Sequence, residues 1–229
     1  MTRRPRICPE GIPQHIIQRG NNRQVCFTKD DDYATYAQWL AEASERYEVQ
    51  IHAWVFMTNH VHLLATPLKE GALSSMMQHL GRRYVRYFNN MYQRTGTLWE
   101  GRFKSCLVHS EHYLLICQRY IEMNPVKAGM VRHPSQYHWS SYHAHAQGVD
   151  AALWTPHDQY LSLGKNKTER QKTYRELFET SLPEEQVQHI RLSVNQGLPL
   201  GNDRFRDEIE RLTGIRQQPL KPGRKKARE

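Results

Sequence analysis

Residues 49–66 read VQIHAWVFMTNHVHLLAT, and this stretch decides the fold. Its first nine residues are rich in β-branched and aromatic side chains, which favour a strand. Thr58 and Asn59 provide a tight turn, and the apolar run that follows predicts a second strand, antiparallel to the first. Residues 49–66 therefore predict a β-hairpin.

The segments on either side of this hairpin alternate between strand and helix patterns. Residues 13–20 (PQHIIQRG) and 102–109 (RFKSCLVH) predict short strands. Apolar residues at helical spacing predict helices after Thr28, over 72–94 and over 111–124. The order strand-helix-strand-strand-helix-strand-helix is typical of a ferredoxin-like or RRM-like α+β fold. We expect an antiparallel four-stranded sheet with helices on one face, followed by a helical, basic C-terminal extension.

The composition changes near residue 145, which predicts a domain over residues 1–145 and an extension over 146–229. The extension starts with a connector of weak periodicity, and two short helices are predicted at 183–195 and 202–213. The last 14 residues, RQQPLKPGRKKARE, carry six basic side chains against one acidic side chain. A segment of this composition is expected to be disordered in isolation.

The overall composition indicates the class of partner. The 229 residues have a net charge of +9, which favours polyanions as partners. The four cysteines form no CxxC pair, so the sequence fits neither a zinc ribbon nor a disulfide framework. No apolar run approaches the length of a membrane span, and no signal peptide is recognisable, so we expect a cytoplasmic protein without a membrane partner.

The motif HVH places two histidines on one face of the second strand of the hairpin. His60 and His62 point the same way because side chains alternate along a strand, whereas Val61 faces the opposite side. Neutral imidazoles suit transition metals, and a third ligand has to come from elsewhere. The alternative is two histidines on a half-exposed strand, since 13 histidines make chance pairs common. A histidine-triad hydrolase is excluded because position 64 is Leu64.

The helix predicted over 111–124 carries a second set of polar groups. Tyr113, Cys117, Tyr120 and Asn124 share one face of this helix. A tyrosine is a competent nucleophile when a metal activates the electrophile, and the Asn124 amide oxygen, one turn further on, is a candidate third ligand. The alternative for Tyr120 is a core tyrosine, because the chain has 12 tyrosines.

Two segments are candidates for contact with nucleic acid. Residues 82–104 combine six basic residues with six aromatic residues, which is what binding of a single strand requires. Tyr84, Tyr87 and Phe88 are assigned to the core, and the predicted contact residues are Arg82, Arg83, Arg86, Trp99, Arg102 and Lys104. The loop RGNNR offers Arg19, Asn21 and Arg23, as a second contact site or as a simple turn.

Three stretches, MTNHVHLL, LWEGRFKS and RYIEMNPVKAGMV, occur in an order that resembles the REP-associated tyrosine transposases. These are relatives of the HUH single-tyrosine transposases of insertion sequences. The resemblance covers about residues 10–140 and implies that His60 and His62, with Asn124, hold Mg²⁺ or Mn²⁺, and that Tyr120 is the nucleophile. It implies cleavage of single-stranded DNA through a 5′-phosphotyrosine link with a free 3′-hydroxyl, on repetitive palindromic sequences that fold into hairpins.

The resemblance also implies a setting for the protein. We expect an enzyme, an HUH-type DNA nickase and strand-transferase, that is associated with the bacterial nucleoid. The alternatives are a hairpin-binding regulator without cleavage and a metal phosphohydrolase that uses water. A monomer is expected, and a dimer that exchanges the tyrosine helix is the alternative. The basic ending KPGRKKA is similar to an AT-hook, but Lys225 stands where that motif has proline.

Overall fold

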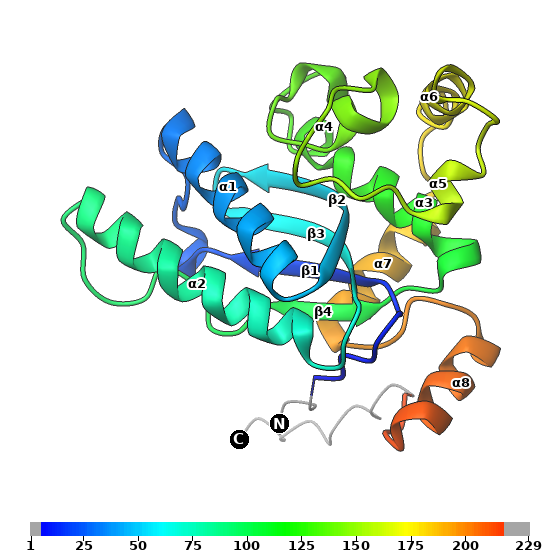
Figure 1. Ribbon diagram of the computed structural model, residues 1–229, viewed down its shortest axis with the longest axis horizontal. Helices are drawn as coiled ribbons and strands as arrows, with labels where there is room; N and C mark the ends of the chain where they lie inside the picture. Colours follow the sequence, from blue (N-terminus) through cyan, green and yellow to red (C-terminus); the bar gives the residue numbers. More distant parts are fainter. Residues whose placement is uncertain (1–5, 218–229) are drawn as a thin grey trace, which may run out of the picture.

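Four antiparallel strands form a single sheet in the computed structural model, which describes residues 6–217 (Figure 1). In chain order they are β1 (Gln14–Arg19), β2 (Val49–Met57), β3 (His60–Pro67) and β4 (Lys104–Leu107), and their spatial order is β2-β3-β1-β4. Strand β1 pairs with both β3 and β4. The predicted α+β fold class and the predicted hairpin are therefore confirmed.

Two long helices cover one face of the sheet. These are α1 (Asp30–Arg46) and α2 (Ala72–Met91), and they enclose a core that includes Phe56 and Leu63. Asp32, in the first turn of α1, caps the start of this helix, because its carboxylate accepts hydrogen bonds from the backbone N–H groups of Thr28 and Lys29. This pairing satisfies N–H groups that have no partner within the helix.

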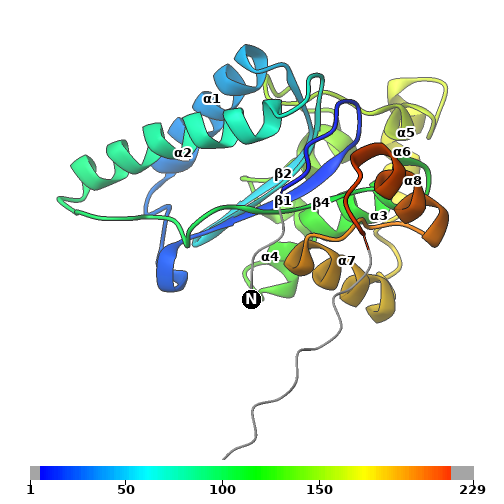
Figure 2. The ribbon, with the colours of Figure 1, turned by 90° about the horizontal axis from the view of Figure 1, so that it is seen from below.

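The opposite face of the sheet is also covered, which corrects the expectation that helices lie on one face only. Helices α3 (Ser110–Glu122) and α7 (Glu184–Gln196) lie below the sheet in Figure 2, whereas α1 and α2 lie above it. The physical reason is that β3 is apolar on both sides: Leu63 packs towards α1 and α2, and Leu64 packs in a second core with residues of α3 and α7. A strand buried on both faces needs a second layer of helices.

The chain after α3 is more helical than the sequence indicates. The predicted C-terminal helices are present as α7 and α8 (Asp203–Thr213). The predicted connector contains α6 (Lys167–Glu176), in which only Tyr174 is buried, so no apolar periodicity marks this helix. The shorter helical segments are α4 (Asn124–Lys127), α5 (Asp158–Leu161), η1 (Asn21–Arg23), η2 (Pro134–Gln136) and η3 (His143–Gln147).

Two expectations about the chain as a whole concern membranes and the basic tail. Within residues 6–217, no helix combines the length and the apolar character that a membrane crossing requires. The predicted AT-hook-like segment falls after residue 217 and lies outside the described residues.

Candidate active site

His60 and His62 lie together on the face of β3 that is covered by α3 and α7. Their ring centroids are 5.0 Å apart, and His62 is only 3% exposed. Burial lowers the pKa of His60 to about 4, with a further contribution from Arg19, and lowers the pKa of His62 well below its ordinary value. Both imidazoles are therefore neutral at pH 7, which is the state that binds a metal ion.

Tyr120 on α3 packs directly against these histidines. Its ring lies edge-on to His62, with 6.0 Å between the centroids, and 5.8 Å from the ring of His15 on β1. Burial raises the pKa of the Tyr120 hydroxyl, while the nearby Arg191 guanidinium of α7 lowers it. The Lys127 ammonium lies 5.0 Å from the centre of the Tyr120 ring. The phenol thus stands between the paired imidazoles and two cations.

Asn124 begins α4, immediately after the helix that carries Tyr120. Its amide nitrogen donates to the backbone oxygens of Tyr120 (2.8 Å) and Ile121 (3.2 Å). In the described part of the chain no hydrogen bond involves its Oδ1 or the Nε2 atoms of His60 and His62. If the predicted ligands His60, His62 and Asn124 act together, their donor set of two imidazole nitrogens and an amide oxygen fits Mn²⁺ better than Mg²⁺.

A second group of potential metal ligands lies at the other end of α3. The side chains of His109, Glu111 and His112 bring their ligand atoms within 4.8 Å of one another. At 1.5 Å per residue this group is about 12–16 Å from Tyr120 along the helix axis. It is therefore separate from the histidine pair on β3.

The predicted contact loop RGNNR lies beside His60. The Gly20 N–H donates to the backbone oxygen of Asn59, and the Asn59 amide donates to the backbone oxygen of Arg23 at 3.1 Å. A Cβ atom on Gly20 would come within 2.2 Å of the Gln24 backbone oxygen, so this approach requires glycine. The structure thus brings Arg19, Asn21 and Arg23 to the end of β3 at which His60 stands.

The other predicted contact residues are divided between several places. Arg82, Arg86 and Arg102 line a groove of about 730 Å³ along α2. Arg83 instead pairs with Glu42 and lies over the Trp39 ring, 4.0 Å from its centroid.

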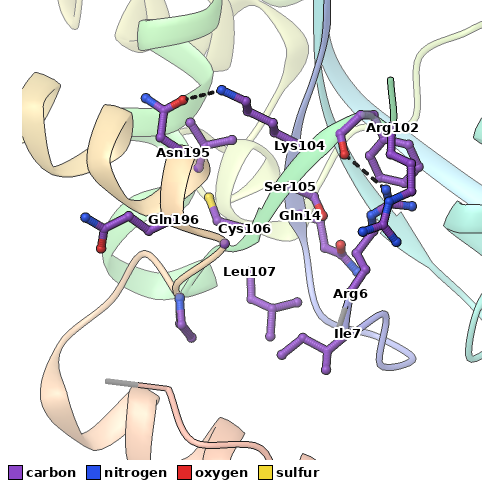
Figure 3. Close-up of a pocket in the computed structure, with 14 residues that line it drawn as sticks. Arg6, Ile7, Gln14, Arg102, Lys104, Ser105, Cys106, Leu107, Asn195 and Gln196 are labelled. Atoms are coloured by element: carbon purple, nitrogen blue, oxygen red, sulfur yellow. Dashed lines mark hydrogen bonds between the residues drawn. The ribbon is translucent and has the colours of Figure 1, made fainter. Parts of the chain in front are cut away.

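Trp99 and Lys104, both predicted as contacts, are engaged within the protein. Trp99 borders the groove but is 8% exposed and packs on Tyr84, so most of its ring belongs to the core. Lys104 donates to the Asn195 side chain at 2.8 Å and borders a small pocket of about 90 Å³ between β4 and the end of α7 (Figure 3).

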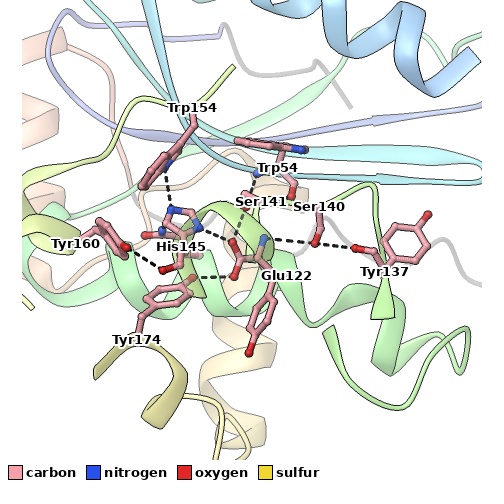
Figure 4. A network of polar contacts seen from close by, with 11 residues as sticks. Trp54, Glu122, Tyr137, Ser140, Ser141, His145, Trp154, Tyr160 and Tyr174 are labelled. Atoms are coloured by element: carbon pink, nitrogen blue, oxygen red, sulfur yellow. Dashed lines mark hydrogen bonds and ion pairs between the residues drawn. The ribbon is translucent and has the colours of Figure 1, made fainter. Parts of the chain in front are cut away.

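A buried polar network anchors the C-terminal end of α3. The Glu122 carboxylate accepts hydrogen bonds from the Ser141 hydroxyl, from Nδ1 of His145 (2.7 Å) and from the Tyr174 hydroxyl (2.8 Å) (Figure 4). The Trp154 indole N–H donates to Nε2 of His145, so the proton of this ring is on Nδ1. Glu122 is two residues from Tyr120, so this network ties the helix of the tyrosine to η3 and α6.

Sequence reasoning missed several residues of the site. His15 alternates with Ile16 in an apolar strand just as His62 alternates with Leu63, and this shared pattern was a usable signal. No sequence signal indicated Arg191 or the Glu122 network, because their partners are distant in the chain.

Comparison with protein families identifies the family of the chain that carries this site. The family of IS200-like transposases matches residues 10–124, half of the chain, and this segment includes His60, His62, Tyr120 and Asn124. The chain belongs to the IS200-like transposases. The resemblance seen in the sequence motifs is confirmed, and a transposase is an enzyme that acts on DNA.

Two solved structures are similar to the transposase. One is a REP-associated tyrosine transposase bound to a REP hairpin, with 22% identity and a TM-score of 0.55, covering 69% of this chain and 93% of that protein. The second, a protein of Deinococcus radiodurans R1 assigned as a transposase, has 20% identity and a TM-score of 0.38, and covers 53% and 96% of the two chains. Curated proteins give no significant match. The first likeness shows that the transposase shares the fold of that relative.

Proposed function

We propose that this transposase is a metal-dependent endonuclease and strand-transferase for single-stranded DNA, of the HUH tyrosine type. Its substrates would be hairpins of repetitive palindromic sequences. The observation that carries the proposal is the packing of the Tyr120 ring against His62, 6.0 Å between centroids, although the two residues come from distant parts of the chain. This contact supports the proposal because the group taken as the nucleophile lies beside a neutral imidazole taken as a metal ligand.

The residues of the site suit transfer of a DNA strand. His60, His62 and Asn124 would hold Mn²⁺ or Mg²⁺, which when bound supplies the positive charge that activates a phosphodiester. The Tyr120 oxygen would bond to phosphorus and lose its proton, while the bond from phosphorus to the 3′ oxygen breaks and that oxygen takes up a proton. The products are a 5′-phosphotyrosine and a free 3′-hydroxyl. One ester replaces another, so rejoining requires no ATP.

The partner is inferred from charge and from the relative that shares the fold. That relative is bound to a REP hairpin, and the present chain places Arg19 and Arg23 beside its histidine pair. We infer that the transposase works at the nucleoid of a bacterial cell. The contact of Tyr120 with His62 of its own chain supports the expected monomer over a dimer that exchanges the tyrosine helix.

One observation favours a second candidate, a regulator that binds repeat hairpins without cutting them. Tyr120 is only 5% exposed, so a phosphodiester reaches its hydroxyl only after some displacement of the covering residues.

A test for a covalent adduct separates these functions. The protein is incubated with a hairpin oligonucleotide and Mn²⁺, and DNA that stays attached in SDS is measured. The proposal predicts an adduct that Tyr120→Phe loses. The control is Tyr113→Phe on the same helix, whose ring packs against His189. A water-using phosphohydrolase would cut without an adduct, a regulator would bind only, and an adduct in Tyr120→Phe would reject the assigned nucleophile.

A further inference from the structure

His15 is a fully buried histidine in β1 that the proposed chemistry does not use. One of its ring nitrogens, Nε2, lies 2.9 Å from Nδ1 of His62. Its other nitrogen, Nδ1, is buried and has no hydrogen-bond partner among residues 6–217. Burial of a ring nitrogen without a hydrogen-bond partner lowers the stability of the fold. We therefore expect the one remaining contact of His15, with His62, to serve a function.

The strand register brings the two rings together. Ile17 lies directly opposite His62 in the β1–β3 pair, so His15 is the diagonal neighbour of His62 on the same face of the sheet. The ring planes differ by only 17° and the centroids are 5.2 Å apart. With 2.9 Å between the nitrogens, the rings meet edge to edge, and the hydrogen bond runs nearly within both ring planes.

His60, the other histidine of the HVH motif, shows how an imidazole of this site is oriented. Nδ1 of His60 lies 2.6 Å from the Asn59 side-chain oxygen. An amide oxygen can only accept, so His60 carries its proton on Nδ1 and presents the Nε2 lone pair. The Asn59 amide nitrogen donates to the Arg23 backbone oxygen, which agrees with this orientation of the amide.

The contact between His15 and His62 allows two arrangements of one proton. The His15 ring is fully buried with no acidic partner among the described residues, and a neutral imidazole has one N–H and one lone pair. If His15 donates, the proton of His62 is on Nε2 and that nitrogen cannot bind a cation. If His62 donates from Nδ1, its Nε2 lone pair is free, as in His60.

We propose that His15 is a positioning residue that accepts a hydrogen bond from Nδ1–H of His62 and keeps the Nε2 lone pair of His62 free for a divalent cation. The inference rests on the proposed function, because it takes His62 as a ligand. Partners of this kind fix the tautomer and the orientation of metal-binding imidazoles, and their loss typically weakens metal binding about 10–100-fold.

Metal affinity provides the first test. Mn²⁺ binding is measured by titration calorimetry on the full chain in the absence of DNA. We expect His15→Phe, which keeps a ring but has no acceptor, to bind Mn²⁺ about 10–100-fold more weakly. We expect His15→Gln, whose amide oxygen can accept, to retain most of the affinity. The matched control is His52→Gln, because His52 is equally buried but bonds to Thr66 and Thr155.

The position of the proton provides a test that requires no substitution of His15. With ¹⁵N-labelled histidine and Zn²⁺ as a diamagnetic probe, long-range ¹H–¹⁵N spectra report which nitrogen of each ring carries hydrogen. The His62 signals are assigned from their loss in His62→Gln. We expect hydrogen on Nδ1 of both His62 and His15. Hydrogen on Nε2 of His15 in the zinc-bound protein would overturn the inference.

The metal site and the role of His15 can be rejected separately. If His60→Gln and His62→Gln both bind Mn²⁺ as the unaltered chain does, the metal site of the proposed function is wrong, and the role of His15 is wrong with it. If those variants lose binding while His15→Phe matches the His52→Gln control, the ligands are correct and only the role of His15 is rejected.

Discussion

At the residue scale, the central group is the Tyr120 hydroxyl, which is subject to two opposing influences. Burial raises its pKa, because the phenolate loses hydration in the apolar layer between α3 and the sheet. The nearby Arg191 guanidinium lowers the pKa, because a cation stabilises the phenolate. Arg191 lies on α7, so the C-terminal extension contributes to the environment of the proposed nucleophile.

Replacing Arg191 tests this balance. Arg191→Gln removes the positive charge, so the pKa of Tyr120 should rise and less phenolate should be present at any given pH. The rise of adduct formation with pH should therefore shift to higher pH, which is measured as a pH–rate profile with the hairpin and Mn²⁺. Arg204→Gln, an exposed change on α8, is the control. An unchanged profile in Arg191→Gln would show that Arg191 does not act on the nucleophile.

At the scale of elements, the position of α3 depends on contacts with the chain that follows it. Glu122 is completely buried, and its carboxylate is bonded to Ser141, His145 and Tyr174. A buried carboxylate is tolerated only when donors satisfy its oxygens. The short helices after α3 therefore hold the end of α3 that carries Tyr120.

Removing one donor should measurably weaken this anchor. Tyr174→Phe takes away the hydroxyl that donates to Glu122, and we expect the free energy of unfolding to fall by about 1–3 kcal/mol. Chemical denaturation followed by circular dichroism measures the change. Tyr142→Phe is the matched control, since Tyr142 is buried in the same aromatic cluster and its hydroxyl has no hydrogen bond to a described residue. Equal losses in both variants would contradict the anchoring role.

At the scale of the whole molecule, cations are arranged on both faces of the sheet. The groove with Arg82 and Arg86 runs along α2, whereas Tyr120 stands on α3 across the sheet. Arg102 lines this groove and also a small hollow that contains Arg19, next to the histidine pair. We expect a DNA strand in the groove to reach the face that carries Tyr120 around the edge formed by β4.

The salt dependence of hairpin binding tests this path. Phosphate contacts release counterions, so affinity should fall as salt rises. The double substitution Arg82→Gln and Arg86→Gln should weaken binding and reduce the slope of log affinity against log salt by about 1–2. Arg83→Gln should leave the slope unchanged, because Arg83 is paired with Glu42. Fluorescence anisotropy over a salt series measures both, and equal slopes in all three proteins would exclude the groove as a phosphate site.

The amino-acid sequence by itself determined the features that depend on local periodicity. Alternation along β3 places His60 and His62 on one face, and helical spacing places Tyr120 one turn before Asn124. The strands and the long helices follow from the same two periods. The motifs within residues 10–124 indicated the family. The division of the chain at residue 145 and the roles of the site residues stay predictions.

The tertiary structure alone decided which distant segments meet. Packing placed α3 and α7 on the second face of the sheet, so that Arg191 reaches Tyr120, and packing also buried Trp99, which local pattern indicated as a DNA contact. The β1–β3 register, one pairing among several possible, set His15 beside His62. A periodic pattern states which face a side chain occupies, but what lies across from that face is settled by strand register and by the burial of apolar surface between elements.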